Sequence, residues 1–217
     1  MIGIIDYGVG NLFSLRSSFD AIGAQTFVSG DEKELAKADK LILPGVGAFG
    51  DAADKLRQTG LDKFVRQQAA KGVPLMGICL GMQLLFEKGF EYGEHEGLGL
   101  LKGNVVGMKG KLPEDLKIPH MGWNALQIVN KDSRLLRNIQ ESDHVYFVHS
   151  FFAEGCEDSL AATSEYGIAI TAAVRQYFAE NPSHFDPRQY LSPARREVKE
   201  MVRQKVWKLQ WKTIAVN

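Results

Sequence analysis

The sequence has few of the features that mark several classes of protein. It contains two cysteines, Cys79 and Cys156, so no disulfide framework is expected, and two thiols are typical of a protein of the reducing cytoplasm. No group of cysteines and histidines has metal-ligand spacing, and neither a metal nor another cofactor is expected. Basic and acidic residues number 26 each, so the total charge gives no reason to expect a nucleic-acid partner.

Long hydrophobic runs are also missing. No apolar run approaches about 18 residues, so no membrane span is expected. The first residues, MIGIIDYG, have no basic region before their apolar stretch and predict a strand rather than a signal peptide. The chain has 217 residues, of which 45% are hydrophobic, which is enough for the core of one domain.

The composition changes near the end of the chain. From Gln176 onward there are eight basic and four acidic residues, whereas the preceding part holds 18 and 22. Three of the seven prolines fall between Pro182 and Pro193, and the segment that begins at Ser192 has the pattern of a capped amphipathic helix. We therefore expect a main domain over residues 1–174 and a divergent helical tail over 175–217.

Hydrophobic patterning in the main domain predicts an α/β fold. In the first half, strands are expected at 2–6, 25–28, 40–45 and 73–78, with helices at 11–22, in one or two pieces over 51–70, and at 80–87. This alternation predicts a mostly parallel sheet flanked by helices, with ligands at the carboxyl ends of its strands. An antiparallel extension of the sheet is expected from strands at 123–129, 144–150, 159–167 and 168–174.

The motif G-x-C-x-G at residues 77–81 is the first candidate for chemistry. It places Cys79 between an apolar strand and a helix, as in the sharp elbow that exposes a nucleophile. The N-terminus of the following helix is expected to lower the pKa of the thiol. The alternative is that Cys79 is a small buried side chain without chemistry.

A second glycine-rich turn, residues 44–47, follows another predicted strand. Its backbone N–H groups are candidates for binding an oxyanion beside Cys79. Taken alone, the turn would be read as a plain connection between a strand and a helix.

Five motifs together resemble one family, and they occur in the order IDYGVGN (5–11), LPGVGAFG (43–50), GICLGMQLLF (77–86), IPHMGWN (118–124) and YFVHS (146–150). In this order they resemble the glutaminase subunits of imidazole glycerol phosphate synthase, which are class I glutamine amidotransferases. The resemblance covers residues 1 to about 174 and implies the fold of that class.

The resemblance implies roles for several residues. Cys79 would attack the side-chain amide of L-glutamine, the Val46–Gly47 segment and the amide of Leu80 would hold the oxyanion, and Gln83, His149 and Ser150 would bind the substrate. The ammonia would pass to a barrel-shaped synthase subunit, the partner in a heterodimer, with the loop that carries Trp123 near the interface. Another amidotransferase, serving a different synthase, is disfavoured by the IPHMGWN motif.

One expected motif is missing. The family completes its triad with a histidine and a glutamate in H-P-E, and none of the five histidines of this chain stands in that motif. In its place, residues 171 to about 202 resemble the C-terminal segment of class II fructose-bisphosphate aldolases, through ENPSHFDPRQYL. The zinc-binding and phosphate-binding segments of that family are absent, so the tail would not bring aldolase chemistry.

His184 and Asp186 form H-x-D in this tail, which is a conceivable substitute for the missing pair. The alternative is an exposed histidine in a proline-rich turn. We therefore expect a glutaminase subunit with impaired turnover, or a non-catalytic subunit that keeps the scaffold and the interface.

Overall fold

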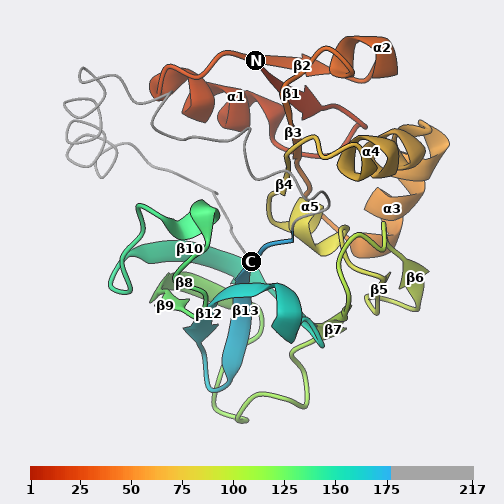
Figure 1. The fold of residues 1–217 in the computed structure, drawn as a ribbon. Coiled ribbons are helices and arrows are strands. Elements are labelled where there is room, and N and C mark those ends of the chain that lie inside the picture. Colours follow the sequence, from red (N-terminus) through yellow and green to blue (C-terminus); the bar gives the residue numbers. More distant parts are fainter. Residues whose placement is uncertain (177–217) are drawn as a thin grey trace.

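A four-stranded parallel sheet forms the first layer of the protein. The computed structural model describes residues 1–176. The strands are β1 (Ile2–Ile5), β2 (Thr26–Ser29), β3 (Lys40–Leu43) and β4 (Leu75–Gly77), in the spatial order β2-β1-β3-β4. The helices between and after them are α1 (Leu12–Ala21), α2 (Glu32–Leu35), α3 (Phe49–Gln58), α4 (Leu61–Ala70) and α5 (Leu80–Gln83). In Figure 1 this part occupies the upper half of the molecule.

The rest of the described chain forms three smaller sheets below the parallel one (Figure 1). One has the order β11-β7-β5-β6 and contains β5 (Lys88–Gly89), β6 (His95–Glu96), β7 (Asn104–Gly107) and β11 (Phe151–Glu154). A ribbon pairs β8 (His120–Ala125) with β10 (His144–His149), and a third sheet has the order β13-β12-β9, from β9 (Gln127–Ile128), β12 (Leu160–Glu165) and β13 (Ala169–Val174). Short 3₁₀ helices lie at η1 (Arg134–Leu136) and η2 (Glu157–Ser159).

The α/β class and the parallel sheet are as the sequence predicts, and the strands predicted at 159–167 and 168–174 form the antiparallel pair β12–β13. The predicted antiparallel strands are present but are divided among separate sheets. The predicted strand at 123–129 is interrupted at Leu126, whose N–H donates instead to the carbonyl of Asp143. The predicted helical tail lies outside the described residues.

The predicted helix at 80–87 is wrong in its length. Helix α5 ends at Gln83 because the carbonyls that would follow are taken by another segment. The N–H groups of residues 98, 99 and 100 donate to the carbonyls of Leu84, Phe86 and Leu85. These tertiary hydrogen bonds replace the contacts that a longer helix would make.

The largest core lies between the parallel sheet and helices α3 and α4. Ile5, Leu43, Phe49 and Phe86 are among its fully buried side chains. Helix α1 buries none of its residues fully, although its apolar residues follow the predicted helical spacing. A second cluster, with Phe147 at its centre, lies beneath β8, β10, β12 and β13.

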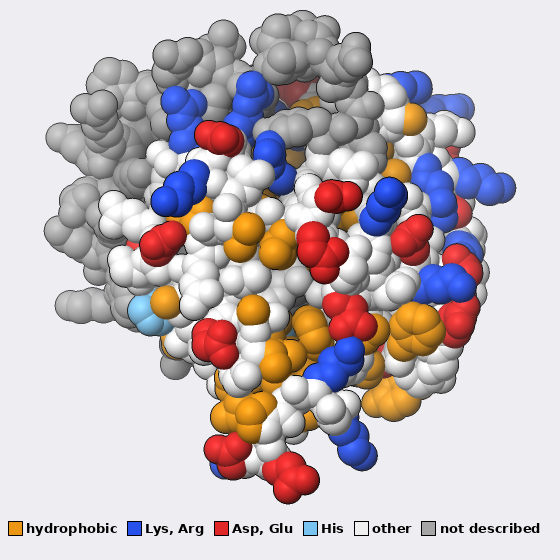
Figure 2. All heavy atoms as spheres, turned by 60° about the horizontal axis from the view of Figure 1, so that its bottom comes forward, with side chains coloured by type: hydrophobic (Ala, Val, Ile, Leu, Met, Phe, Trp, Pro, Cys, Tyr) orange, Lys and Arg blue, Asp and Glu red, His pale blue; other side chains and the backbone are white. Residues whose placement is uncertain are grey.

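The lower face of the molecule carries charges of both signs. Figure 2 shows Lys and Arg side chains interspersed with Asp and Glu side chains there, and hydrophobic side chains gathered toward the lower part of this face. Among the described residues, no helix is both long enough and apolar enough to cross a membrane.

Candidate active site

Cys79 stands at the sharp turn between β4 and α5. Its backbone has φ 56° and ψ −123°, and it is the residue that caps the N-terminus of α5. Only one other non-glycine residue in the described chain, Tyr92, has a positive φ. Such a conformation is costly for an L-residue and persists where the surrounding structure enforces it. The elbow that the G-x-C-x-G motif predicts is therefore formed.

The two glycines of the motif allow backbone segments to meet. A Cβ atom on Gly81 would lie 1.9 Å from the carbonyl oxygen of Leu43, and one on Gly77 would lie 2.5 Å from the carbonyl oxygen of Gly81. Neither glycine has a positive φ, so the left-handed position falls on the cysteine itself. The glycines allow the backbone segments to approach each other closely, and any side chain at residue 81 would push β3 away from α5.

The turn after β3 lies directly against this elbow. A Cβ atom on Gly45 would lie 2.5 Å from the Gly81 nitrogen, so the two backbones touch. Gly47 has φ 91° and open space around it, and Val46 is 45% exposed. The structure thus brings residues 44–47 to the same edge of the sheet as Cys79 and Leu80, with backbone still accessible at Val46 and Gly47.

The electrostatics of Cys79 differ from the sequence-based expectation. Burial raises the pKa of the thiol above its ordinary value of 9.0, and a hydrogen bond from the Leu80 backbone N–H acts in the opposite direction without cancelling it. Helix α5 has a single turn, so its N-terminus carries little dipole. The prediction of a lowered pKa is wrong for this site as it stands, and the thiol needs a base in order to react at neutral pH.

Within residues 1–176, no histidine forms a hydrogen bond with the sulfur of Cys79. His95 contacts the Glu91 carbonyl, His144 contacts the Ser142 carbonyl, and His120 and His149 bond to each other. His184 and Asp186 lie outside the described residues. The described part of the site therefore supplies a nucleophile without a base.

Gln83 and His149 meet at one backbone group. The Gln83 side-chain nitrogen donates to the carbonyl of Phe151 at 3.2 Å, and His149 Nδ1 lies 2.9 Å from the same oxygen. Both side chains are buried, at 5% and 7% exposure. Ser150 links β10 to β11, and its carbonyl accepts the N–H of Met108. These three residues tie the elbow helix to the β10–β11 segment.

His149 belongs to a buried network that reaches across the β8–β10 ribbon. Its Nε2 lies 3.0 Å from His120 Nδ1, and His120 Nε2 lies 2.9 Å from the Asn124 side chain. The His120 ring stacks on Tyr166 at a centroid distance of 3.9 Å. Burial lowers the pKa of both histidines, that of His149 to about 4, so both rings are neutral near pH 7.

The sequence did not single out two residues that border this site. Tyr7, from the IDYGVGN motif, is 3% exposed, and its hydroxyl donates to the Pro44 carbonyl at 2.8 Å. The carboxylate of Glu91 accepts the Phe49 N–H at 2.7 Å, where the 44–48 turn enters α3. Tyr7 belongs to one of the motifs that carry the family resemblance. In contrast, no local pattern around Glu91 indicates that its carboxylate accepts a hydrogen bond from a residue 42 positions away.

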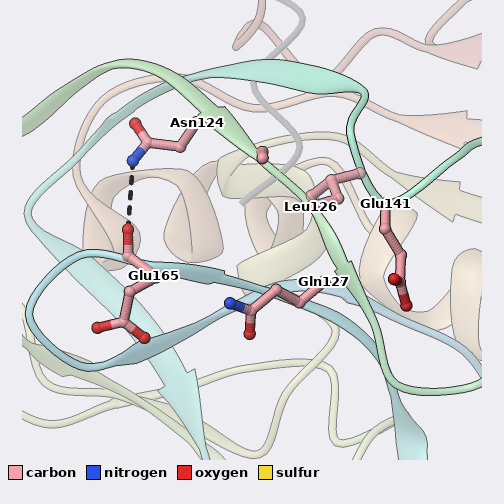
Figure 3. A pocket seen from close by; sticks show the side chains of 6 residues that line it. Asn124, Leu126, Gln127, Glu141 and Glu165 are labelled. Atoms are coloured by element: carbon pink, nitrogen blue, oxygen red, sulfur yellow. Dashed lines mark hydrogen bonds between the residues drawn. The ribbon is translucent and has the colours of Figure 1, made fainter.

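A cavity of about 500 Å³ lies elsewhere, beside the β8–β10 ribbon. Figure 3 shows its labelled walls: Asn124, Leu126, Gln127, Glu141 and Glu165. Asn124 donates to the backbone carbonyl of Glu165 across it. None of the predicted site residues lines this cavity. In the part of the chain that the structure describes, no cluster of His, Cys, Asp and Glu side chains is arranged to hold a metal ion.

Comparison with known proteins agrees with the fold. The family model of class-I glutamine amidotransferases matches residues 3–178. A solved glutamine amidotransferase has a TM-score of 0.59 at 18% identity, covering 75% of this chain and 79% of its own. The glutaminase domain of Trypanosoma brucei CTPS has a TM-score of 0.55 at 19% identity, covering 93% and 92%. The chain is a class I glutamine amidotransferase.

Curated relatives identify a narrower family within this class. The imidazole glycerol phosphate synthase subunit HisH of Sulfurimonas denitrificans is 50% identical over 177 residues, which are 80% of this chain and 84% of that protein. The HisH subunits of Bacillus licheniformis and Caldanaerobacter subterraneus are each 51% identical over 80% of this chain, and over 82% and 84% of their own length. Within its class, the chain belongs to the HisH family.

The raised thiol pKa predicts how Cys79 reacts. Alkylation by iodoacetamide should be slow at pH 7 and rise about tenfold per pH unit without levelling off below pH 9, because only the thiolate reacts. The measurement is the alkylation rate from pH 6 to 10, read by mass spectrometry. Cys79→Ala is the control, since it leaves only Cys156, which is 4% exposed. A rate that is already level below pH 8 would contradict the assignment.

The lowered pKa of His149 predicts a loss of stability in acid. Above the ordinary histidine value of 6.5, neither the folded nor the unfolded state binds the proton, and His149 does not affect stability. Below it, the unfolded chain takes up a proton that the folded chain refuses until about pH 4. Between pH 7 and 5 this lowers the free energy of unfolding by about 2 kcal/mol.

Urea unfolding at several pH values measures this decline. His149→Gln should flatten it, even if the variant is less stable at every pH. His144→Asn, which removes an exposed histidine from the same strand, should leave the slope unchanged. Equal slopes for wild type and His149→Gln would contradict the buried neutral state.

Proposed function

We propose that this protein binds L-glutamine and supplies ammonia to a barrel-shaped synthase subunit that makes imidazole glycerol phosphate in histidine biosynthesis. The formed elbow at Cys79 carries this proposal, together with membership of the HisH family. The domain responsible is residues 1–174, and residues 175–217 are a divergent tail.

The proposed reaction uses Cys79 as its nucleophile. The Cys79 sulfur adds to the carboxamide carbon, and the π-electron pair moves onto the amide oxygen. The backbone N–H groups of Val46–Gly47 and Leu80 stabilise this oxyanion. The intermediate collapses as the thiol proton reaches the departing nitrogen, so ammonia leaves and a glutamyl thioester remains. Water then cleaves the thioester to glutamate and restores the thiol.

We assign Gln83, His149 and Ser150 to substrate binding. Gln83 and His149 act by holding the backbone around Ser150 in place. The amide of Gln83 and the ring of His149 fix the Phe151 carbonyl, which sets the path of the backbone around Ser150. That backbone is the part of the β10–β11 segment that we assign to the substrate. No cofactor takes part in these steps.

Turnover requires proton transfers for which residues 1–176 supply no base. Both proton transfers need a base, and removal of triad partners lowers rates by a factor of about 10⁴ to 10⁶. No histidine bonds to Cys79 within residues 1–176, and the raised thiol pKa works against spontaneous ionisation. These observations favour a second candidate function, a non-catalytic subunit that keeps the scaffold and the partner interface.

The β8–β10 ribbon supplies the partner interface in this proposal. Met121 pairs with Val148, and Trp123 with Tyr146, so the four side chains share one face of the ribbon. Met121 and Trp123 are 61% and 56% exposed. Exposed methionine and aromatic side chains at the centre of a patch are typical of residues that dominate binding energy.

Glutamate release tests the reaction. The purified chain is mixed with the cognate synthase subunit and its nucleotide ligand, with HisH of Bacillus licheniformis as the intact reference. We expect Cys79-dependent release that is at least about 10⁴-fold slower than the reference. Release that persists in Cys79→Ala would contradict the proposed nucleophile. Release near the reference rate that disappears in His184→Asn would show that the tail supplies a base.

Binding to the synthase subunit tests the interface. Trp123→Ala should weaken the affinity by about 30-fold, as expected for a central aromatic anchor. The control is Tyr92→Ala, which removes an aromatic side chain that is 92% exposed near β5 and β6. Isothermal titration calorimetry measures both. Equal effects of the two substitutions would exclude the Met121–Trp123 face as the interface.

A further inference from the structure

Tyr7 connects the first strand to both parts of the candidate active site. It follows β1 at the carboxyl edge of the sheet and is buried in the main core, at 3% exposure. Its hydroxyl donates to the Pro44 carbonyl at 2.8 Å, and this contact is buried. Pro44 directly precedes Gly45, Val46 and Gly47, the segment that lies against the elbow.

The hydroxyl of Tyr7 is a permanent donor. Burial raises the pKa of the phenol well above its ordinary range, and the nearby Cys79 thiolate raises it further. The hydroxyl therefore stays protonated at every pH at which the protein is folded and active. The phenol is thus close enough to Cys79 for the charge of the thiolate to act on it, and it contacts the turn directly.

Pro44 packs against two segments of the chain, whereas Gly47, at the end of the turn, does not. The chain after Tyr7 packs on the proline, since a Cβ atom on Gly10 would lie 3.0 Å from Pro44 Cβ. On the other side, a Cβ atom on Gly81 would lie 2.9 Å from the Pro44 carbonyl carbon. Gly47, in contrast, has φ 91° and open space around it. The direction in which the Val46 and Gly47 N–H groups point thus depends on how the Pro44 peptide is fixed.

We propose that Tyr7 is a positioning residue, whose hydroxyl fixes the Pro44 carbonyl and thereby aims the Val46–Gly47 backbone at the oxyanion formed on Cys79. The proposal rests on the proposed glutaminase function. Tyr7 contacts neither the substrate nor the oxyanion, and it acts through the backbone of the turn. Loss of the hydroxyl leaves a buried carbonyl without this donor and removes one restraint on the orientation of the peptide.

The test compares two reagents on Tyr7→Phe and needs no catalytic base. The chloroketone analogue of glutamine carries a ketone oxygen where the amide oxygen would sit, so its reaction with Cys79 depends on the aimed N–H groups. Iodoacetamide alkylates the thiol without that requirement. The change from Tyr7 to Phe should slow the chloroketone reaction about tenfold, and the iodoacetamide rate should stay within about twofold.

Tyr92→Phe is the control. Tyr92 is 92% exposed and lies between β5 and β6, so its hydroxyl does not support the turn. It should change neither rate.

Each outcome decides the question. Equal loss of both reactions in Tyr7→Phe would mean that the thiol itself is disturbed, and no loss would mean that the carbonyl needs no support; either overturns the proposal. Glutamine should also protect wild-type Cys79 from the chloroketone. Without that protection, the proposed glutaminase function fails, and the role of Tyr7 fails with it. With protection present and no selectivity in Tyr7→Phe, only the role of Tyr7 fails.

Discussion

The contact between the backbones of β3, its following turn and α5 is the constraint on which the site depends. The Leu43 carbonyl accepts the Ile78 N–H and lies where any side chain on Gly81 would have to be. Gly45 touches the Gly81 nitrogen at the same point. Three segments thus meet without intervening side chains, and this approach forces Cys79 into its left-handed conformation. The chemistry follows from packing, because a looser junction would leave the turn and the thiol apart.

The sequence predicts the parts of this arrangement that depend on local pattern. Alternating strands and helices identify the parallel sheet, and G-x-C-x-G identifies the elbow. Prediction from the sequence fails where groups from distant parts of the chain change the local structure or environment. The helix expected at 80–87 is cut short because the carbonyls of Leu84, Leu85 and Phe86 bind a segment about 14 residues away. The pKa of Cys79 was predicted wrongly for the same reason, since the burial that raises it is a property of the folded core.

The residues in and around the site also divide into those that a local pattern predicts and those that it does not. Cys79 and the 44–47 turn were found from their own neighbourhoods in the sequence. Tyr7 and Glu91 act over separations of 37 and 42 residues, through a single hydrogen bond each. No periodicity marks such a residue. The buried pair of His120 and His149 is comparable, because a lone histidine in a strand gives no sign of the ring that it will face.

The β8–β10 ribbon has one exposed face and one buried face. Met121 and Trp123 point to the exposed face, and the His120–His149 pair lies on the buried one. In a strand the two faces alternate with every residue, so His120 and Trp123, three residues apart, lie on opposite faces. A single residue inserted or deleted between them would turn the strand beyond that point over and place Trp123 on the buried face together with His120. The relative placement of the exposed pair and the buried histidines therefore depends on the length of β8, and only changes of two residues would preserve it.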